Sequence, residues 1–95
     1  MAKERWEDIL EHLRRDYNRE KEVSLPNLET YLVQKGHKHD PIVTLSAINH
    51  LHKEEYCNVK KSEYPSYISI EVLLEGYKYY DDNLKEKDND EKIGF

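Results

Sequence analysis

The chain has 95 residues, of which 37% are hydrophobic and 37% are charged, and its formal net charge is −5. A chain of this length supports one small hydrophobic core, which must come from amphipathic elements because long apolar runs are absent. The single cysteine excludes an internal disulfide, and no segment has the roughly 20 apolar residues of a membrane span. With no secretory pattern at its start, we expect a soluble cytoplasmic protein without a membrane partner.

Acidic side chains are concentrated toward the end of the chain. Residues 71–95 carry 8 acidic and 4 basic side chains, whereas residues 1–70 carry 12 and 11. Between residues 35 and 53 the balance reverses, because three lysines and four histidines stand against one carboxylate, Asp40. An anionic partner would be least repelled at this stretch.

The first predicted helix spans residues 3–17. Apolar side chains recur there at spacings of three and four, from Trp6 to Tyr17, and leave the opposite face charged. The polar stretch that follows has no such pattern, and residues 23–25 are too few for more than a bridge-like strand or a loop. We therefore expect little regular structure between this helix and the next.

A second and a third helix follow in close succession. Pro26 favours the first turn of a short helix over residues 26–35, and Gly36 provides its end. The dipeptide Asp40–Pro41 combines an N-cap residue with the favoured first helical residue. The third helix is therefore expected over about residues 41–54.

A β-hairpin and a last helix are predicted in the second half. Residues 56–59 and 67–70 are rich in aromatic and β-branched side chains, and the polar residues 60–66 between them form the tip. Apolar residues then recur at about 3.5-residue intervals, which predicts a helix over residues 71–87. The expected fold class is α+β and mostly helical.

Near the end of the third predicted helix and the start of the hairpin, the chain carries Ala47, Ile48, Leu51 and Tyr56. With these residues, the order of elements resembles the winged helix-turn-helix superfamily of small bacterial, archaeal and phage regulators. The resemblance covers roughly residues 5–84 and implies a three-helix helix-turn-helix core, a β-hairpin wing and a C-terminal helix. It implies one domain over residues 1–87, with residues 88–95 as a charged, flexible tail. Glu55 stands where the family often has glycine, so we expect a less favourable backbone conformation or a different helix ending there.

The resemblance implies a transcription regulator that reads double-stranded DNA with the third helix and the wing at residues 60–66. Asparagine, serine and histidine side chains suit base edges, whereas lysine neutralises phosphate. The basic residues before the third helix would add to its positive N-terminus and hold a phosphate there. The predicted DNA contacts are Lys38, His39, Thr44, Ser46, Asn49, His50, Lys53, Lys60, Lys61 and Tyr64.

Each of these assignments has an alternative. The same polar residues occur on any solvated helix face, residues 38–39 could be an ordinary polar loop, and Tyr64 could pack on the hairpin. The function has an alternative as well, a winged-helix module that binds protein through the same surfaces without contacting DNA. The net negative charge and the tyrosine-rich second half favour that alternative.

One face of the last helix is a candidate dimer interface. Many winged-helix regulators dimerise through a terminal helix, and their two-fold symmetry then matches a palindromic operator. Packing against the first helix of the same chain is the alternative. The apolar residues of this face are Leu73, Tyr77, Tyr80 and Leu84.

The histidine pairs do not predict a metal site. His50 and His52 are two residues apart on a helix, so their side chains point about 200° apart and cannot bind one ion together. His37 and His39 could converge with Cys57 only by a long-range coincidence, and Cys57 itself is expected to be a small buried hydrophobe. The sequence has no phosphate loop, hydrolase arrangement or paired catalytic carboxylates, so we expect no cofactor and no enzymatic activity.

Overall fold

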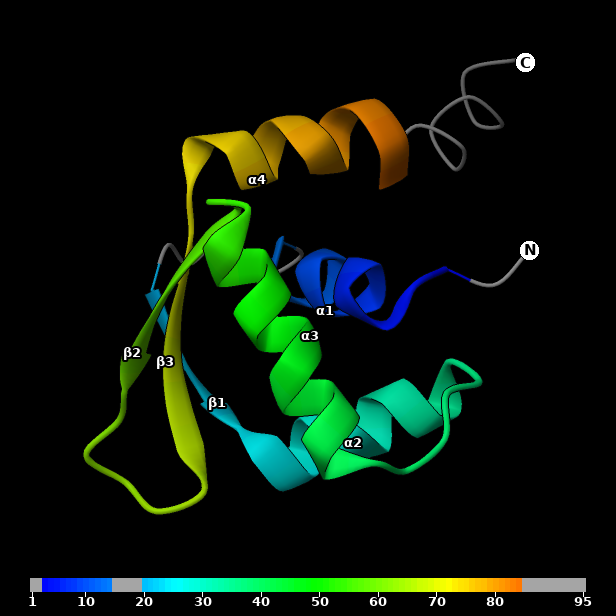
Figure 1. Ribbon diagram of the computed structural model, residues 1–95, viewed down its shortest axis with the longest axis vertical. Coiled ribbons are helices and arrows are strands. Elements are labelled where there is room, and N and C mark those ends of the chain that lie inside the picture. Colours follow the sequence, from blue (N-terminus) through cyan, green and yellow to red (C-terminus); the bar gives the residue numbers. More distant parts are fainter. Residues whose placement is uncertain (1–2, 15–19, 85–95) are drawn as a thin grey trace, which may run out of the picture.

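The computed structural model describes residues 3–14 and 20–84, which form an α+β fold around a three-stranded antiparallel sheet (Figure 1). The α+β class predicted from the sequence is confirmed. Strand β3 lies between the other two strands and pairs antiparallel with both. The elements are α1 (Arg5–Arg14), β1 (Glu20–Ser24), α2 (Leu25–Gln34), α3 (Pro41–Lys53), β2 (Cys57–Lys61), β3 (Tyr67–Val72), α4 (Leu74–Tyr79) and the π-helical η1 (Tyr80–Leu84).

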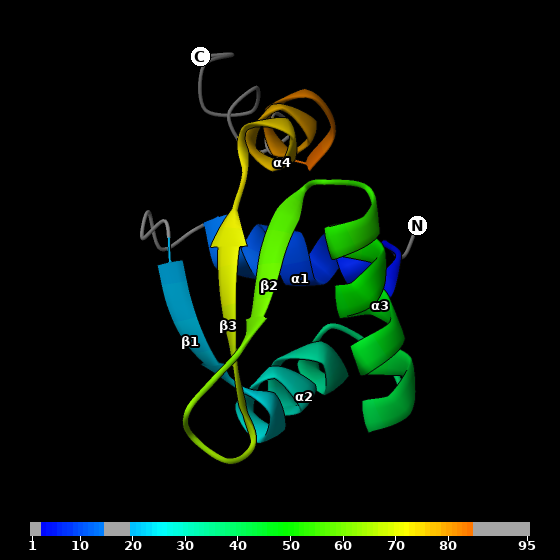
Figure 2. The same ribbon diagram turned by 60° about the vertical axis from the view of Figure 1, so that its left-hand side comes forward.

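The helices surround the sheet on one face and at one end. Figure 2 shows α1 and α2 behind the sheet, α3 beside the β2 edge and α4 beyond the end of β3. The apolar stripes of α1, α2 and α3 meet the inward side chains of the strands, which produces one core. Within the described residues, no helix is long and apolar enough to cross a membrane. The buried core residues are Ile9, Leu10, Leu13, Val23, Leu28, Leu32, Ala47, Ile48, Leu51, Cys57, Ile70, Val72 and Leu84.

Local sequence signals set the limits of α2 and α3, as predicted. The Ser24 hydroxyl accepts a hydrogen bond from a backbone N–H in the first turn of α2, and Gly36 follows the helix with a φ of 101°. The Asp40 carboxylate caps α3 in the same way, accepting from the Val43 N–H at 3.3 Å. Glu55 adopts a φ of 64°, so the expected unfavourable conformation is confirmed at the end of α3.

Strand β1 is where the sequence-based prediction was wrong. All five of its residues pair with β3, and Val23 faces Ile68 across the ladder. These pairs join segments more than 40 positions apart, so the strand depends on a partner that local periodicity does not report. The final helix also begins at Leu74 rather than Glu71, because Glu71 and Val72 still pair with β2. Tyr17 and the predicted tail lie outside the described residues.

Helix α4 is held to the rest of the fold by a close backbone approach. The Leu73 N–H donates to the Tyr56 carbonyl oxygen at 2.9 Å, just before the helix begins. A Cβ atom placed on Gly76 would lie 2.3 Å from that same oxygen and 3.0 Å from Val72 Cγ1. The glycine at this position therefore lets the helix dock against the turn that follows α3.

Candidate nucleic-acid interface

Helix α3 has one buried face and one fully solvated face. Thr44, Ala47, Ile48 and Leu51 are buried, and they lie on one side of the helix at about 100° per residue. Asp40 precedes the helix and Glu54 follows it, but no carboxylate lies on α3 itself. In a chain with 20 acidic residues this leaves a helix face without negative charge. We define the outward stripe as the exposed residues Ile42, Leu45, Ser46, Asn49 and Lys53.

The β2–β3 hairpin places further predicted contacts near α3. Its tip and the N-terminal end of α3 lie at the same end of the molecule in both ribbon views (Figures 1 and 2). Lys60 and Lys61 are exposed at the end of β2. Tyr64 is exposed and meets Tyr67 edge-on, with ring centroids 6.0 Å apart. This contact fits the alternative of a tyrosine that packs on the hairpin.

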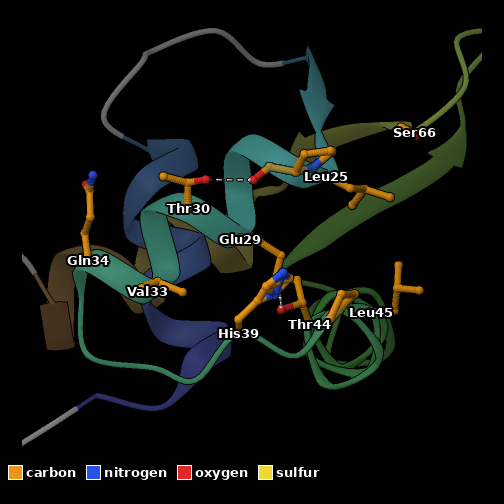
Figure 3. A pocket seen from close by; sticks show the side chains of 11 residues that line it. Leu25, Glu29, Thr30, Val33, Gln34, His39, Thr44, Leu45 and Ser66 are labelled. Carbon is orange, nitrogen blue, oxygen red and sulfur yellow. Dashed lines mark hydrogen bonds and ion pairs between the residues drawn. The ribbon is translucent and has the colours of Figure 1, made fainter.

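A groove of about 730 Å³ lies between α2 and α3. In Figure 3 the two helices form its sides, with Glu29, His39 and Thr44 between them. Leu45, an outward-stripe residue, also lines the groove, as does Ser66 from the hairpin. Its apolar lining is completed by Leu25, Pro26, Val33 and Pro41.

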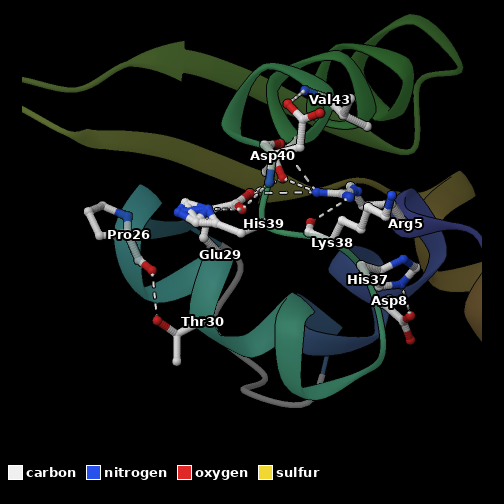
Figure 4. A network of polar contacts seen from close by, with 11 residues as sticks. Arg5, Asp8, Pro26, Glu29, Thr30, His37, Lys38, His39, Asp40 and Val43 are labelled. Carbon is white, nitrogen blue, oxygen red and sulfur yellow. Dashed lines mark hydrogen bonds and ion pairs between the residues drawn. The ribbon is translucent and has the colours of Figure 1, made fainter.

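A buried polar network fixes the start of α3 against α1 and α2 (Figure 4). The Arg5 guanidinium donates to the Thr44 hydroxyl at 2.7 Å and to the backbone carbonyls of Lys38 and Asp40 at 2.8 and 3.3 Å. The Glu29 carboxylate accepts from the Asp40 N–H at 2.9 Å and from the Thr44 hydroxyl, and lies 3.7 Å from Arg5. The Arg5 guanidinium and the Glu29 carboxylate therefore connect α1 and α2 to the start of α3.

Thr44 is the clearest error among the predicted DNA contacts. Its side chain is 1% exposed and both of its hydroxyl hydrogen bonds are made inside the network. It lies on the same helix face as Ile48 and Leu51, so helical geometry keeps it away from any ligand of the outward stripe. We therefore remove Thr44 from the interface and assign it to the positioning of α3.

His50 is also less available than predicted. It is half-buried on the side of α3 that faces α1, and its ring lies 4.8 Å from the Trp6 indole. Trp6 also contacts Tyr56 and Tyr79, which closes an aromatic cluster over the end of α3. His50 is therefore a packing residue at the edge of the outward stripe.

Tyr79 of the same aromatic cluster donates a hydrogen bond to Glu7 at 2.6 Å. Burial, together with this hydrogen bond, raises the pKa of Tyr79 to about 12.

The turn before α3 differs from the predicted phosphate site. Lys38 and His39 are exposed, but the adjacent helix end is already occupied by the carboxylates of Asp40 and Glu29. His39 Nδ1 lies 3.4 Å from Glu29 Oε1. Negative charge at this end offsets the helix dipole, which disfavours a phosphate there. Lys38 and His39 remain predicted contacts through their side chains alone.

The predicted dimer face lies largely against the chain's own core. Leu84 is 8% exposed, and Leu73, Tyr77 and Tyr80 are half-buried. The Arg14 guanidinium of α1 lies 5.0 and 5.3 Å from the Tyr77 and Tyr80 ring centres. The stripe thus packs on α1, which was the alternative, and Leu84 is removed from the candidate dimer face.

The remaining histidines and the cysteine have separate surroundings. His37 Nε2 lies 2.6 Å from Asp8 Oδ2, which ties the α2–α3 turn to α1, whereas His52 Nδ1 accepts from the Val59 N–H at 3.4 Å. Cys57 is buried as predicted, and its burial raises the pKa of the thiol to about 12. In the described part of the chain, no three histidine, cysteine or acidic side chains gather as metal ligands would.

Sequence reasoning missed Arg5 and Glu29, although one signal was present. Glu29 lies four residues after Leu25 and three before Leu32, so it occupies a position within the apolar stripe of α2. A charged residue at such a position indicates a buried ion pair, but its partner on α1 has no counterpart signal.

No protein-family model, curated protein or solved structure matches this chain.

Proposed function

We propose that this protein is a winged-helix DNA-binding regulator that places α3 in the major groove and the β2–β3 hairpin on the flanking backbone. The observation that carries the proposal is the outward stripe, a solvated helix face without carboxylates, together with Lys60 and Lys61, which are exposed at the end of β2. The element order and the antiparallel sheet are compatible with a winged-helix layout. An exposed helix next to a hairpin with lysines suits a groove lined by phosphates.

The outward stripe has the right chemistry for base edges and phosphates. Asn49 can pair with adenine in the major groove, and Ser46 can donate or accept a hydrogen bond. Lys53 lies at the last turn of α3, where its charge complements the helix dipole and reaches toward phosphate. The remaining predicted contacts, Lys38 and His39, flank the other end of the helix.

Salt dependence of binding tests the role of the hairpin lysines. We expect the affinity of the wild-type protein for a duplex selected from a randomised pool to fall with ionic strength. The Lys60→Ala, Lys61→Ala double variant should show a log–log slope shallower by roughly 1.8, because each phosphate contact contributes about 0.9. Fluorescence anisotropy at a series of salt concentrations measures both slopes.

Lys78→Ala is the control for loss of one lysine charge outside the hairpin. Lys78 is exposed near Glu75 on α4, which lies at the opposite end of the molecule from the hairpin tip (Figure 1), so its removal should leave the slope unchanged. Equal slopes for the wild-type protein and the double variant would show that the hairpin does not touch the backbone. Circular dichroism of each variant establishes that the fold is intact.

A second candidate function is protein binding through the groove between α2 and α3. The apolar lining of that groove and the exposure of Val33 and Leu45 favour it. A protein ligand would show weak salt dependence compared with DNA, because few counterions are released when apolar surface is buried. Absence of duplex binding at low salt would therefore favour this candidate over the first.

A further inference from the structure

The first half of the outward stripe is aliphatic and strongly exposed. Ile42 is 76% exposed and Leu45 is 47% exposed, and Val43 beside them is 44% exposed. Three aliphatic side chains in water within one helical turn lose hydrophobic stabilisation unless a ligand covers them. The N-terminal half of a recognition helix is also the part that meets base edges in helix-turn-helix complexes.

The size and charge of this aliphatic patch limit what can cover it. The three side chains on α3 alone supply only a small part of the roughly 800 Å² per partner that a standard protein interface buries, and Leu45 connects them to the apolar lining of the α2–α3 groove. The patch continues into Asn49 and Lys53 on a helix without carboxylates, with Lys60 and Lys61 on the neighbouring hairpin. An anionic ligand with isolated apolar groups complements this surface better than a second copy of an acidic chain.

The major groove of DNA offers one apolar group at its base edges, the C5 methyl of thymine. Guanine, by contrast, is read most often by arginine or lysine at O6 and N7. Helix α3 has no arginine, and Lys53 is its single lysine, located in the last turn. The first half of α3 therefore has the side chains to recognise thymine and lacks those that recognise guanine.

The spacing along α3 fits several neighbouring base pairs. Ile42 and Asn49 are seven residues apart, which is about 10.5 Å along the axis at a rise of 1.5 Å per residue. That length equals about three base-pair steps of 3.4 Å. A methyl contact at Ile42 and an adenine contact at Asn49 can therefore belong to one short A·T-rich sequence.

We propose that α3 recognises A·T-rich major-groove sequence by placing Ile42 and Leu45 against thymine methyl groups and Asn49 against adenine. This inference rests on the proposed DNA-binding function and specifies the class of sequence read. Phosphate contacts from the lysines position the helix, and the aliphatic residues then discriminate between base pairs.

Deoxyuridine in place of thymidine tests the inference without altering the protein. The selected duplex is prepared with uracil at each thymine of its central positions, which removes only the methyl groups. We expect the affinity to fall by roughly fourfold for each contacted methyl, the effect of burying one such group. The Ile42→Ala, Leu45→Ala double variant should bind the thymine and uracil duplexes equally, whereas Leu74→Ala, at a residue of α4 that is 71% exposed, should discriminate as the wild-type protein does.

The binding experiments distinguish failure of the thymine inference from failure of the proposed DNA-binding function. Binding that is insensitive to uracil, or a selected site rich in G·C pairs at its centre, would overturn the thymine inference and leave DNA binding intact. Absence of binding to any duplex at low salt would overturn both the inference and the proposed function.

Discussion

Replacing Glu29 by alanine is expected to lower the free energy of unfolding by about 3 kcal/mol. The substitution leaves the Thr44 hydroxyl and the Asp40 N–H without their acceptor, and leaves the buried Arg5 guanidinium without its carboxylate. Each loss costs desolvation that the folded state no longer recovers. Urea denaturation followed by circular dichroism measures the change.

Two control variants distinguish disruption of the polar network from the general effect of losing a carboxylate. They are Glu29→Gln and Glu75→Ala. The glutamine keeps one acceptor oxygen, so part of the stability should remain. Glu75 is exposed on α4, where an ion pair contributes little, and its removal should change stability by less than about 0.5 kcal/mol. A loss below about 1 kcal/mol for Glu29→Ala would mean that the network does not position α3.

Gly76→Ala is expected to destabilise the fold by about 2 kcal/mol or more. The new methyl group would overlap the Tyr56 carbonyl oxygen, a backbone atom that cannot move without disturbing the Leu73 hydrogen bond. Helix α4 must shift outward, which opens the aromatic cluster that includes Trp6 and Tyr79.

Trp6 reports this shift directly, because it is the chain's single tryptophan. Its emission should move to longer wavelength in the folded Gly76→Ala protein as water reaches the indole. Lys78→Ala, on the same helix and exposed, should leave both the emission and the stability nearly unchanged. Wild-type stability and emission for Gly76→Ala would contradict the close approach of α4.

Much of the fold follows from short-range signals in the sequence. Asp40–Pro41 sets the start of α3, and Gly36 sets the end of α2. The end of α3 also involves close neighbours, since Glu55 in the left-handed region lets the Tyr56 N–H donate to the Leu51 carbonyl at 3.0 Å. These features depend on neighbours a few residues apart, which a single sequence displays.

The parts that sequence reasoning missed depend on distant partners. Strand β1 forms because it pairs with β3. Arg5 is buried because its guanidinium contacts Glu29 on α2 and Thr44 on α3. Thr44 is among the predicted DNA contacts, although helical geometry alone groups it with Leu51. The same distant packing buries Leu84 of η1 in the core of its own chain.

Chemical-shift mapping by NMR during titration with the selected duplex tests the DNA-binding proposal most directly. The proposal predicts that the largest amide shifts fall on the outward stripe, from Ile42 to Lys53, and on the hairpin around Lys60 and Lys61. The α4 amides should change less than those of the hairpin tip and the first turns of α3, because α4 lies at the opposite end of the molecule from both (Figure 1). Shifts confined to α4, or no shifts at low salt, would contradict the assignment of α3 as the DNA-reading helix.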